Sequence, residues 1–291
     1  MHETIVKGIL SANHGMNLYR GCTHGCIYCD SRSKCYQMKH VFEDIEVKIN
    51  APKLLDETLS RKRNKCMIAT GAMTDPYLQI EETLCHTRKC LEIILKHGFG
   101  VTIITKSDRI LRDLDLLEQI NNQTKCVVQM TLTTYDEELC KVVEPNVCTT
   151  KRRFEVLKIL QQHNIPTVVW LTPILPFIND TRENIEGILN YCIDAKVYGI
   201  ICFSMGLTLR DGNREYYYQK LDEKFPGLKE QYIKTYGNSY ELNSPDNHKL
   251  MALFRRICSQ NNIEHNVNHC FSYLKEFGQK DQFTQISLDF K

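Results

Sequence analysis

The sequence lacks several features that would assign it to a common protein class. Its 37 basic and 35 acidic residues leave a formal net charge of only +2, so no global charge indicates nucleic acid or an anionic membrane as partner. No apolar run approaches the ~20 residues that cross a bilayer. The residues after Met1 have neither the basic start nor the apolar run of a secretory signal. We therefore expect a soluble, cytoplasmic protein with no membrane partner.

Cysteine, in contrast, is abundant, with 14 residues in a chain of 291. A secreted disulfide scaffold would be short and rich in loops, and this chain is neither. Cys66, Cys126 and Cys202 lie in strand-like segments, where a free thiol packs as a small hydrophobic group. The composition therefore fits a reducing compartment.

Strand-like and helix-like segments alternate along the chain. Apolar, β-branched segments predict six strands, at 16–21, 66–72, 101–105, 127–134, 167–172 and 200–204. Helical segments are predicted between them at 82–96, 109–120, 150–163 and 182–195, with Asp180 as a cap of the last. Buried strands that alternate with helices predict parallel βαβ units, which wind into an open sheet or a barrel.

The choice between these two architectures rests on where the polar residues fall. The sequence has no G-x-G-x-x-G turn, which would favour an open dinucleotide-binding sheet. Polar residues instead follow several different strands, as they do in barrel enzymes. We predict an α/β fold with a partial (β/α)6 TIM-like barrel over residues 1–210. Residues 211–291, richer in Tyr, Lys and Asn, are predicted to form a mostly helical C-terminal extension packed on the barrel.

A cysteine-rich loop follows the first predicted strand. Residues 17–33 read NLYRGCTHGCIYCDSRS and contain Cys22, Cys26 and Cys29. Thiolates are the preferred ligands of iron–sulfur clusters. Three ligands on one loop would bind three irons of a [4Fe–4S] cluster and leave the fourth iron open to a substrate or cofactor. Gly21 and Gly25 allow the loop to fold tightly around such a cluster.

Two other interpretations of the loop remain open from the residues alone. The three thiols could bind zinc with His24 or His14, although zinc sites usually contain a second Cys-x2-Cys knuckle and this chain has none. The grouping could also arise by chance in a cysteine-rich chain. We do not assign Cys35 as a fourth ligand, because it would close the open iron.

The segment CTHGCIYC at 22–29 resembles the signature of the radical S-adenosylmethionine (SAM) superfamily. Further segments resemble, in order, the branch related to spore photoproduct lyase: TGAMTDPY at 70–77, ITKS at 104–107 with Arg112-Asp113, TLTT at 131–134, Glu144-Pro145, and PILP at 173–176 with Asn179-Asp180. These matches span roughly residues 16–205. The resemblance implies an enzyme that cleaves SAM reductively on a [4Fe–4S] cluster. The resulting 5′-deoxyadenosyl radical would abstract hydrogen from an unidentified substrate.

The resemblance also implies roles for particular residues. The cluster ligands would be Cys22, Cys26 and Cys29. The contacts to SAM would be Lys106 at the methionine carboxylate, Thr74 and Asp75 at the methionine or ribose, Gly71 through its backbone, Thr131 at the ribose, and Tyr28, Pro173 and Ile174 near the adenine. No catalytic residue is assigned. An electron donor of the flavodoxin or ferredoxin type is the implied partner.

The chain departs from spore photoproduct lyase at its hydrogen-return relay. Ala72 occupies the position of the lyase's cysteine hydrogen donor, and Asp30 replaces a tyrosine after the last cluster cysteine. We therefore do not expect thymine-dimer repair, and we expect SAM to be consumed unless a thiol such as Cys258 or Cys270 folds over the site. Two alternative functions are a nucleic-acid repair or modification enzyme of that type and a non-catalytic iron–sulfur electron carrier.

Two short basic runs bear on the nucleic-acid alternative. They are Arg61-Lys62-Arg63 and Lys151-Arg152-Arg153. We predict that each is a solvated helix face rather than a nucleic-acid surface.

Overall fold

The centre of the molecule is an all-parallel sheet. We describe it from a computed structural model that covers residues 1–278. The strands lie in the order β2 (Gly15–Met16), β5 (Met67–Thr70), β6 (Gly100–Thr105), β7 (Cys126–Thr131), β8 (Thr167–Trp170) and β9 (Gly199–Ile201). Each strand pairs with the next in chain order, and β2 and β9 are the two edges. The predicted α/β class with six parallel strands, open between the first and the last, is therefore confirmed.

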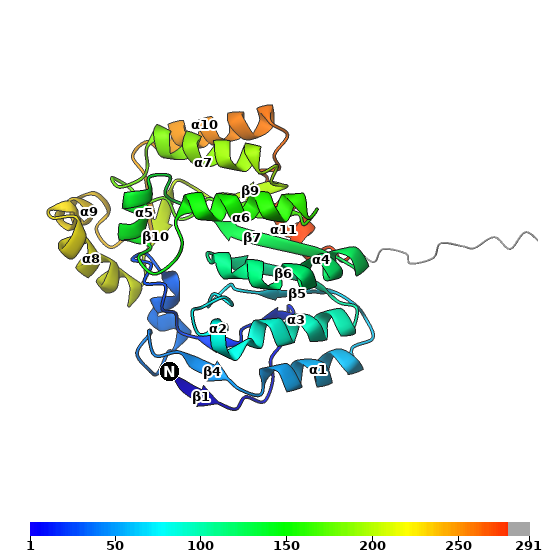
Figure 1. The fold of residues 1–291 in the computed structure, drawn as a ribbon. Helices are drawn as coiled ribbons and strands as arrows, with labels where there is room; N and C mark the ends of the chain where they lie inside the picture. The colour runs from blue at the N-terminus through cyan, green and yellow to red at the C-terminus, as the bar shows by residue number, and fades with distance from the viewer. Residues whose placement is uncertain (279–291) are drawn as a thin grey trace, which may run out of the picture.

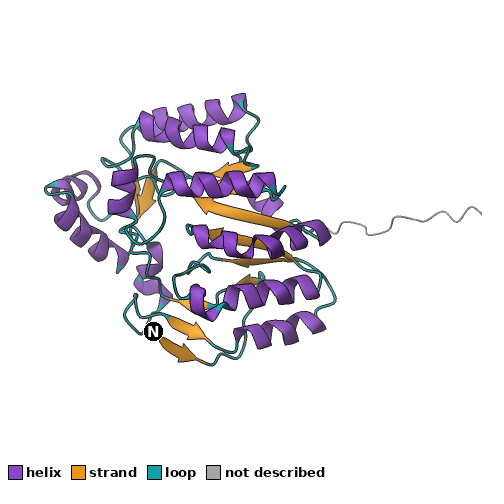
Figure 2. Ribbon diagram, viewed as in Figure 1, coloured by secondary structure: helices purple, strands orange, loops and turns teal. Residues whose placement is uncertain are grey.

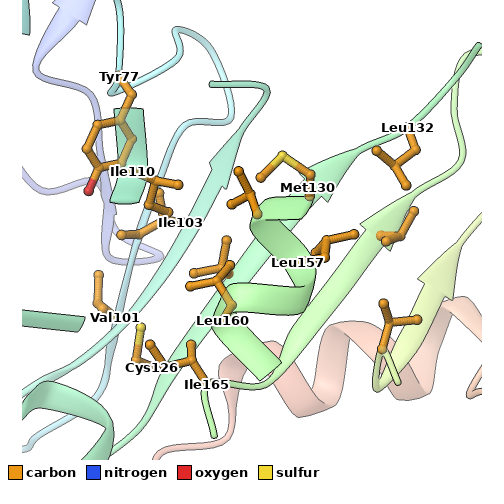
Figure 3. Close-up of a cluster of buried hydrophobic side chains, with 14 of the residues drawn as sticks. Tyr77, Val101, Ile103, Ile110, Cys126, Met130, Leu132, Leu157, Leu160 and Ile165 are labelled. Atoms are coloured by element: carbon orange, nitrogen blue, oxygen red, sulfur yellow. The ribbon is translucent and has the colours of Figure 1, made fainter. Parts of the chain in front are cut away.

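Five long helices cover one side of this sheet (Figures 1 and 2). They are α1 (Ala51–Arg61), α3 (His86–Lys96), α4 (Leu114–Gln123), α6 (Thr150–Gln162) and α7 (Arg182–Asp194). Alternate strand residues point toward the helices, so Val101 and Ile103 of β6 pack in one apolar cluster with Leu157 and Leu160 of α6 (Figure 3). This core holds the strands rigidly, and their carboxyl ends meet at one edge of the sheet.

Some local predictions were wrong in their details. The predicted helix 82–96 is interrupted at Cys85, whose left-handed φ of 51° separates α2 (Glu81–Leu84) from α3. Asp180 does not cap α7, because the Thr181 side chain accepts the hydrogen bond from the Asn184 amide. A small sheet was missed, in which β1 (His2–Thr4), β4 (Glu46–Lys48) and β3 (Tyr19–Arg20) pair in that order. Its strands are two or three residues long, too short to show a pattern.

The C-terminal region is mostly helical, as predicted. It contains β10 (Gly206–Thr208), α8 (Asn213–Lys224), α9 (Leu228–Tyr236), β11 (Glu241–Asn243), α10 (Asn247–Gln260) and α11 (Val267–Lys275). β10 pairs with β11, α10 packs against α7, and α11 packs against β9. The division of the chain at residue 210 remains a prediction. Within residues 1–278, no helix combines the length and the hydropathy that a membrane span requires.

Candidate metal centre at the carboxyl ends of the strands

A cavity of about 110 Å³ lies where the cysteine loop crosses the ends of β5, β6 and β7. Its walls contain all three predicted cluster ligands and five predicted SAM contacts, namely Cys22, Cys26, Cys29, Tyr28, Gly71, Asp75, Lys106 and Thr131. These residues are separated by up to 109 positions in the sequence. The parallel strands bring them together because their carboxyl ends share one edge of the sheet.

Three predicted SAM contacts are not in the walls of this cavity. Thr74 is buried, with 6% of its surface exposed. Pro173 follows a cis peptide bond to Thr172, and Ile174 is fully buried and donates its amide hydrogen to the Gly206 carbonyl at 3.1 Å. Contact of these three residues with a cofactor therefore remains a prediction that the cavity does not support.

The cysteine loop is shaped by segments distant in the sequence. The Cys22 amide donates to the Phe42 carbonyl at 3.0 Å, and the Asn146 amide donates to the His24 carbonyl at 3.1 Å. Gly21 has a φ of +89°, and a Cβ there would lie 2.5 Å from the Phe42 oxygen. Gly21 is therefore required by the neighbouring backbone as well as by its own conformation.

The three loop thiols are not a closely packed ligand set as they stand. Among residues 1–278, the group of ligand atoms that all lie within 4.8 Å of one another does not include the loop cysteines. The choice between an iron–sulfur cluster and zinc at these thiols stays a prediction from the sequence.

Two of the loop thiols are buried, and burial affects their protonation. Burial raises the pKa of Cys22 to about 12, and burial also raises the pKa of Cys26. Both thiols therefore hold their protons near neutral pH without a metal. Binding iron would replace these protons, because the thiolate is the ligand.

Asp75 is committed to hydrogen bonds within the protein. Its Oδ1 accepts from the Thr105 hydroxyl at 2.8 Å and from the Tyr77 amide at 2.9 Å. Its Oδ2 accepts from the Lys106 amide at 2.8 Å and lies 3.6 Å from Nδ1 of His24. Asp75 thus joins the ends of β5 and β6, and it holds the backbone of Lys106 in place.

Lys106 presents a positive charge to the cavity. Its Nζ lies 5.7 Å from the centre of the Tyr28 ring. No carboxylate oxygen of the described chain, residues 1–278, lies within 4.0 Å of this nitrogen. Burial would lower the pKa of Lys106, but the neighbouring Cys26 and Glu144 raise it above its ordinary value. The ammonium is therefore charged and available to an anionic ligand.

A buried ion pair supports the aromatic residue of the loop. The Tyr28 hydroxyl donates to Glu144, whose other oxygen lies 2.6 Å from Nη2 of Arg153. Arg153 also donates to the Thr131 carbonyl at 3.0 Å, and neither charged side chain is exposed. The prediction that residues 151–153 form a solvated face is therefore wrong for Arg153. The basic run alone gave no sign that its third residue, at helical spacing, faces inward.

His24 is a further polar side chain of the cavity wall. It is 4% exposed, and its Nε2 has no hydrogen-bond partner within the described residues. Burial lowers the pKa of His24. A buried nitrogen without a partner costs free energy, which a ligand in the cavity would recover.

Cys148 lies directly behind the cavity wall, where its thiol donates to the Lys106 carbonyl at 3.1 Å, and the three cysteines considered next do not line the cavity. Cys35 is exposed and accepts from the Arg210 guanidinium at 3.6 Å. Cys258 packs in the core on the helix side of the sheet, and Cys270 lies among apolar residues of α11. Neither thiol folds over the site, whereas Ala72 lines it.

Comparison with known proteins finds a family and several relatives. The family model described as Radical SAM superfamily matches residues 16–192. An uncharacterised protein of Mycobacterium tuberculosis is 26% identical over 255 residues, which are 81% of this chain and 73% of that protein. An uncharacterised protein of Acidianus two-tailed virus is 30% identical over 229 residues, 74% of this chain and 74% of that protein.

Solved structures of spore photoproduct lyase variants share the fold. One aligns with a TM-score of 0.63 at 14% identity and covers 89% of this chain and 78% of its own. Another, which contains AdoMet and a dinucleoside spore photoproduct, aligns with a TM-score of 0.59 at 14% identity over 86% of this chain and 74% of its own. At this identity the likeness is one of fold.

Proposed function

Because this chain belongs to the radical SAM superfamily, we propose that Cys22, Cys26 and Cys29 hold its cluster and that the enzyme abstracts hydrogen from a substrate still to be identified. The chain is an enzyme of the radical SAM class, and its cofactors are a [4Fe–4S] cluster and S-adenosylmethionine. The observation that carries the assignment of ligands is the single cavity that contains all three cysteines and the Lys106 ammonium.

When bound, these cofactors supply the radical chemistry: an electron from the cluster cleaves S-adenosylmethionine to methionine and a 5′-deoxyadenosyl radical. The protein's own task is to bind and orient the cofactors and to shield the site from solvent. Lys106 attracts the methionine carboxylate, since its charge has no carboxylate partner among residues 1–278. Asp75 keeps the Lys106 backbone at the end of β6 through its hydrogen bond to the amide.

Tyr28, Glu144 and Arg153 act as a positioning unit. The hydrogen bond from Tyr28 to Glu144 fixes the ring beside Cys29, and Arg153 balances the charge of Glu144. A ring held in this way offers a flat apolar wall for an adenine. Arg153 also contacts the Thr131 carbonyl, so the same unit fixes the backbone of the predicted ribose contact.

We infer that SAM is consumed in each turnover. Among the described residues, the cavity walls contain no cysteine besides the three cluster ligands, and the relay position is Ala72. Asp30, at the second relay position, accepts from the Tyr36 hydroxyl at 2.7 Å and has a structural role. With the true substrate, we expect one 5′-deoxyadenosine per product molecule, and many products per 5′-deoxyadenosine would contradict this.

The experiment that tests the ligand assignment is anaerobic reconstitution. We expect about four irons and four sulfides per chain, and dithionite-reduced protein should slowly convert SAM to 5′-deoxyadenosine and methionine. Replacing Cys22, Cys26 or Cys29 by Ala should abolish the cluster. Cys35→Ala is the matched control, because this exposed thiol follows the loop and does not line the cavity. Loss of the cluster in Cys35→Ala would refute the assignment.

The second basic run gives the nucleic-acid alternative little support. Arg152 is paired with Asp108 and Glu155, and Arg153 is buried, so the second basic run offers only Lys151 as a free charge. Salt-dependent binding of DNA or RNA by the holoenzyme would revive this alternative. An electron donor of the flavodoxin or ferredoxin type and a cytoplasmic location, where free thiols stay reduced, belong to the same proposal.

A further inference from the structure

A second group of potential metal ligands lies in the small sheet, outside the cysteine loop. His2 is on β1, Glu46 is on β4, and these two residues are directly paired across the strands. His40 and Asp44 belong to the segment that leads into β4. One ligand atom of each of His2, His40 and Asp44 lies within 4.8 Å of the other two.

The hydrogen bonds of His40 assign its tautomer. Its Nδ1 lies 3.0 Å from the Val41 carbonyl oxygen, which can only accept, so Nδ1 carries the hydrogen. In the neutral ring, Nε2 then has a lone pair. This Nε2 is buried, has no hydrogen-bond partner within residues 1–278, and lies 3.7 Å from Oε2 of Glu46. Two acceptors that face each other need a proton or a metal ion between them.

His2 faces the same carboxylate, although its side chain is 41% exposed. Its Nδ1 lies 2.8 Å from Oδ2 of Asp44, which accepts the ring hydrogen. Its Nε2 lies 3.9 Å from the same Glu46 oxygen that faces His40. The other oxygen of Asp44 lies 2.5 Å from the Met1 amino nitrogen, which holds this carboxylate in place. The Nε2 atoms of both imidazoles thus lie within 4.0 Å of one carboxylate oxygen.

We propose that His2, His40 and Asp44, whose ligand atoms all lie within 4.8 Å of one another, bind a divalent transition-metal ion such as Zn²⁺. Bonds of 2.0–2.2 Å to such an ion place tetrahedral ligands about 3.4 Å apart, so the three side chains would move toward one another by about 1 Å on binding. Glu46, which lies 3.7 Å from Nε2 of His40 and 3.9 Å from Nε2 of His2, is placed to serve as a further ligand. The Val41 carbonyl orients the His40 ring, as outer partners of histidine ligands commonly do.

The site lies on the segment that supports the cysteine loop. Phe42 stands between His40 and Asp44, and its carbonyl accepts from the Cys22 amide at 3.0 Å. The two rings are in contact, with centroids 4.7 Å apart. An ion that joins His2 to His40 would therefore connect β1 to the backbone that fixes the first cluster cysteine. This site is separate from the proposed cluster and needs none of its ligands.

The test is zinc binding by the full chain with its cluster reconstituted. We propose anaerobic equilibrium dialysis against Zn²⁺, with zinc and iron counted by mass spectrometry and zinc ligands identified by X-ray absorption. We expect one zinc per chain with nitrogen and oxygen ligands at 2.0–2.2 Å and no loss of iron. His2→Ala/His40→Ala should lose this zinc, and Asp44→Ala, which removes the third ligand, should lose it as well.

The matched control is His163→Ala/His269→Ala, which removes two other surface histidines. His163 lies 3.4 Å from Glu118 and His269 lies 3.2 Å from Glu264, so each faces a single carboxylate. This control should keep its zinc. Three results would each overturn the proposal: wild type without bound zinc, zinc that survives His2→Ala/His40→Ala, or zinc with sulfur ligands at ~2.3 Å, which would place it in the cysteine loop. If protonated imidazoles pair with the carboxylates and no metal binds, wild type will contain no zinc, which is the first of these results.

Discussion

A lysine lies beside a tyrosine ring at each end of the parallel sheet, but the two lysines differ in their partners and in the direction in which their pKa is shifted. Lys125 precedes β7 at the amino end, and its Nζ lies 3.7 Å from the centre of the Tyr273 ring and donates to the Tyr273 carbonyl at 2.7 Å. Lys106 follows β6 at the carboxyl end, and its Nζ lies 5.7 Å from the centre of the Tyr28 ring. Burial lowers the pKa of Lys125, whereas nearby Cys26 and Glu144 raise that of Lys106 against the effect of burial.

The difference follows from what covers each end. At the amino end, α11 packs Cys270 and Leu274 against Met67, Val127 and Val168, and this cluster is apolar. At the carboxyl end, the cysteine loop leaves a cavity lined by thiols and polar groups. We call the amino end, which α11 covers, the closed end; there Lys125 is hydrogen-bonded within the protein and contributes to the fold. We call the carboxyl end, which has the cavity, the open end; there Lys106 has no carboxylate partner among the described residues, which suits a site that binds a carboxylate.

The largest effect expected from this contrast is on stability at the open end. Glu144→Gln would leave Arg153 buried without its counter-charge, at a cost of about 3–5 kcal/mol in the free energy of unfolding. Asp56→Asn near the amino end of the sheet would weaken the surface contacts of this carboxylate with Lys96 and His97 and should have a much smaller effect. Urea unfolding of the cluster-free variants measures both. Equal losses would mean that the network beneath the cavity is not a structural support.

The same variant makes a prediction about pH. Burial would raise the pKa of Glu144, but the charge of Arg153 and further contacts hold it below its ordinary value. A depressed pKa stabilises the fold above the ordinary glutamate value of about 4.3, and this contribution disappears as the pH falls through the depressed pKa. The stability gap between wild type and Glu144→Gln should be constant from pH 8 to 5 and shrink in stronger acid. A gap that widens with acid would contradict the assigned sign.

The next effect concerns the cofactor. Lys106→Met should weaken SAM binding to the reconstituted enzyme by about 1.5–3 kcal/mol, because it removes a charge-assisted contact. Lys125→Met is the matched control, since it removes a half-buried lysine over a tyrosine ring at the closed end, and it should leave SAM affinity unchanged. Isothermal titration calorimetry compares the two. If Lys106→Met binds SAM as tightly as wild type, the carboxylate has another partner.

The smallest expected effect is a difference in stability between two glycine substitutions, one at each end of the sheet. Gly71 has a φ of +97°, and a Cβ there would lie 2.0 Å from the Ile104 oxygen. At Gly100 the nearest atom would be the flexible Met67 sulfur at 2.4 Å, with the Lys125 oxygen at 2.9 Å. Gly71→Ala should therefore cost about 1–3 kcal/mol more than Gly100→Ala in thermal or urea unfolding. A larger loss for Gly100→Ala would show that β5 and β6 are packed more loosely at the cavity.

Much of this molecule follows from the sequence because its signals are local. A short run of β-branched residues predicts a buried strand wherever it occurs, so five of the six central strands were placed within about three residues of their ends. The spacing of Cys22, Cys26 and Cys29 likewise predicts a common ligand, because one loop carries all three. The resemblance to the radical SAM superfamily implied that Asp75, Lys106 and Thr131 belong to the site, and the strand-end rule for barrels agrees with their positions after three strands.

Tertiary structure alone decided which side chains are free to act. Asp75 is a predicted cofactor contact that lines the cavity, and only the structure shows that four hydrogen-bond or charge partners within the protein use its oxygens. Arg153 appeared to be solvated, and Glu144, nine residues earlier, makes it a buried support of Tyr28. The pairing of β1 with β4 brings His2 to His40, and no local pattern predicts it. The free energy of burying a polar group depends on its hydrogen-bond and charge partners, and these partners come from segments distant in the chain. The sequence alone does not identify them.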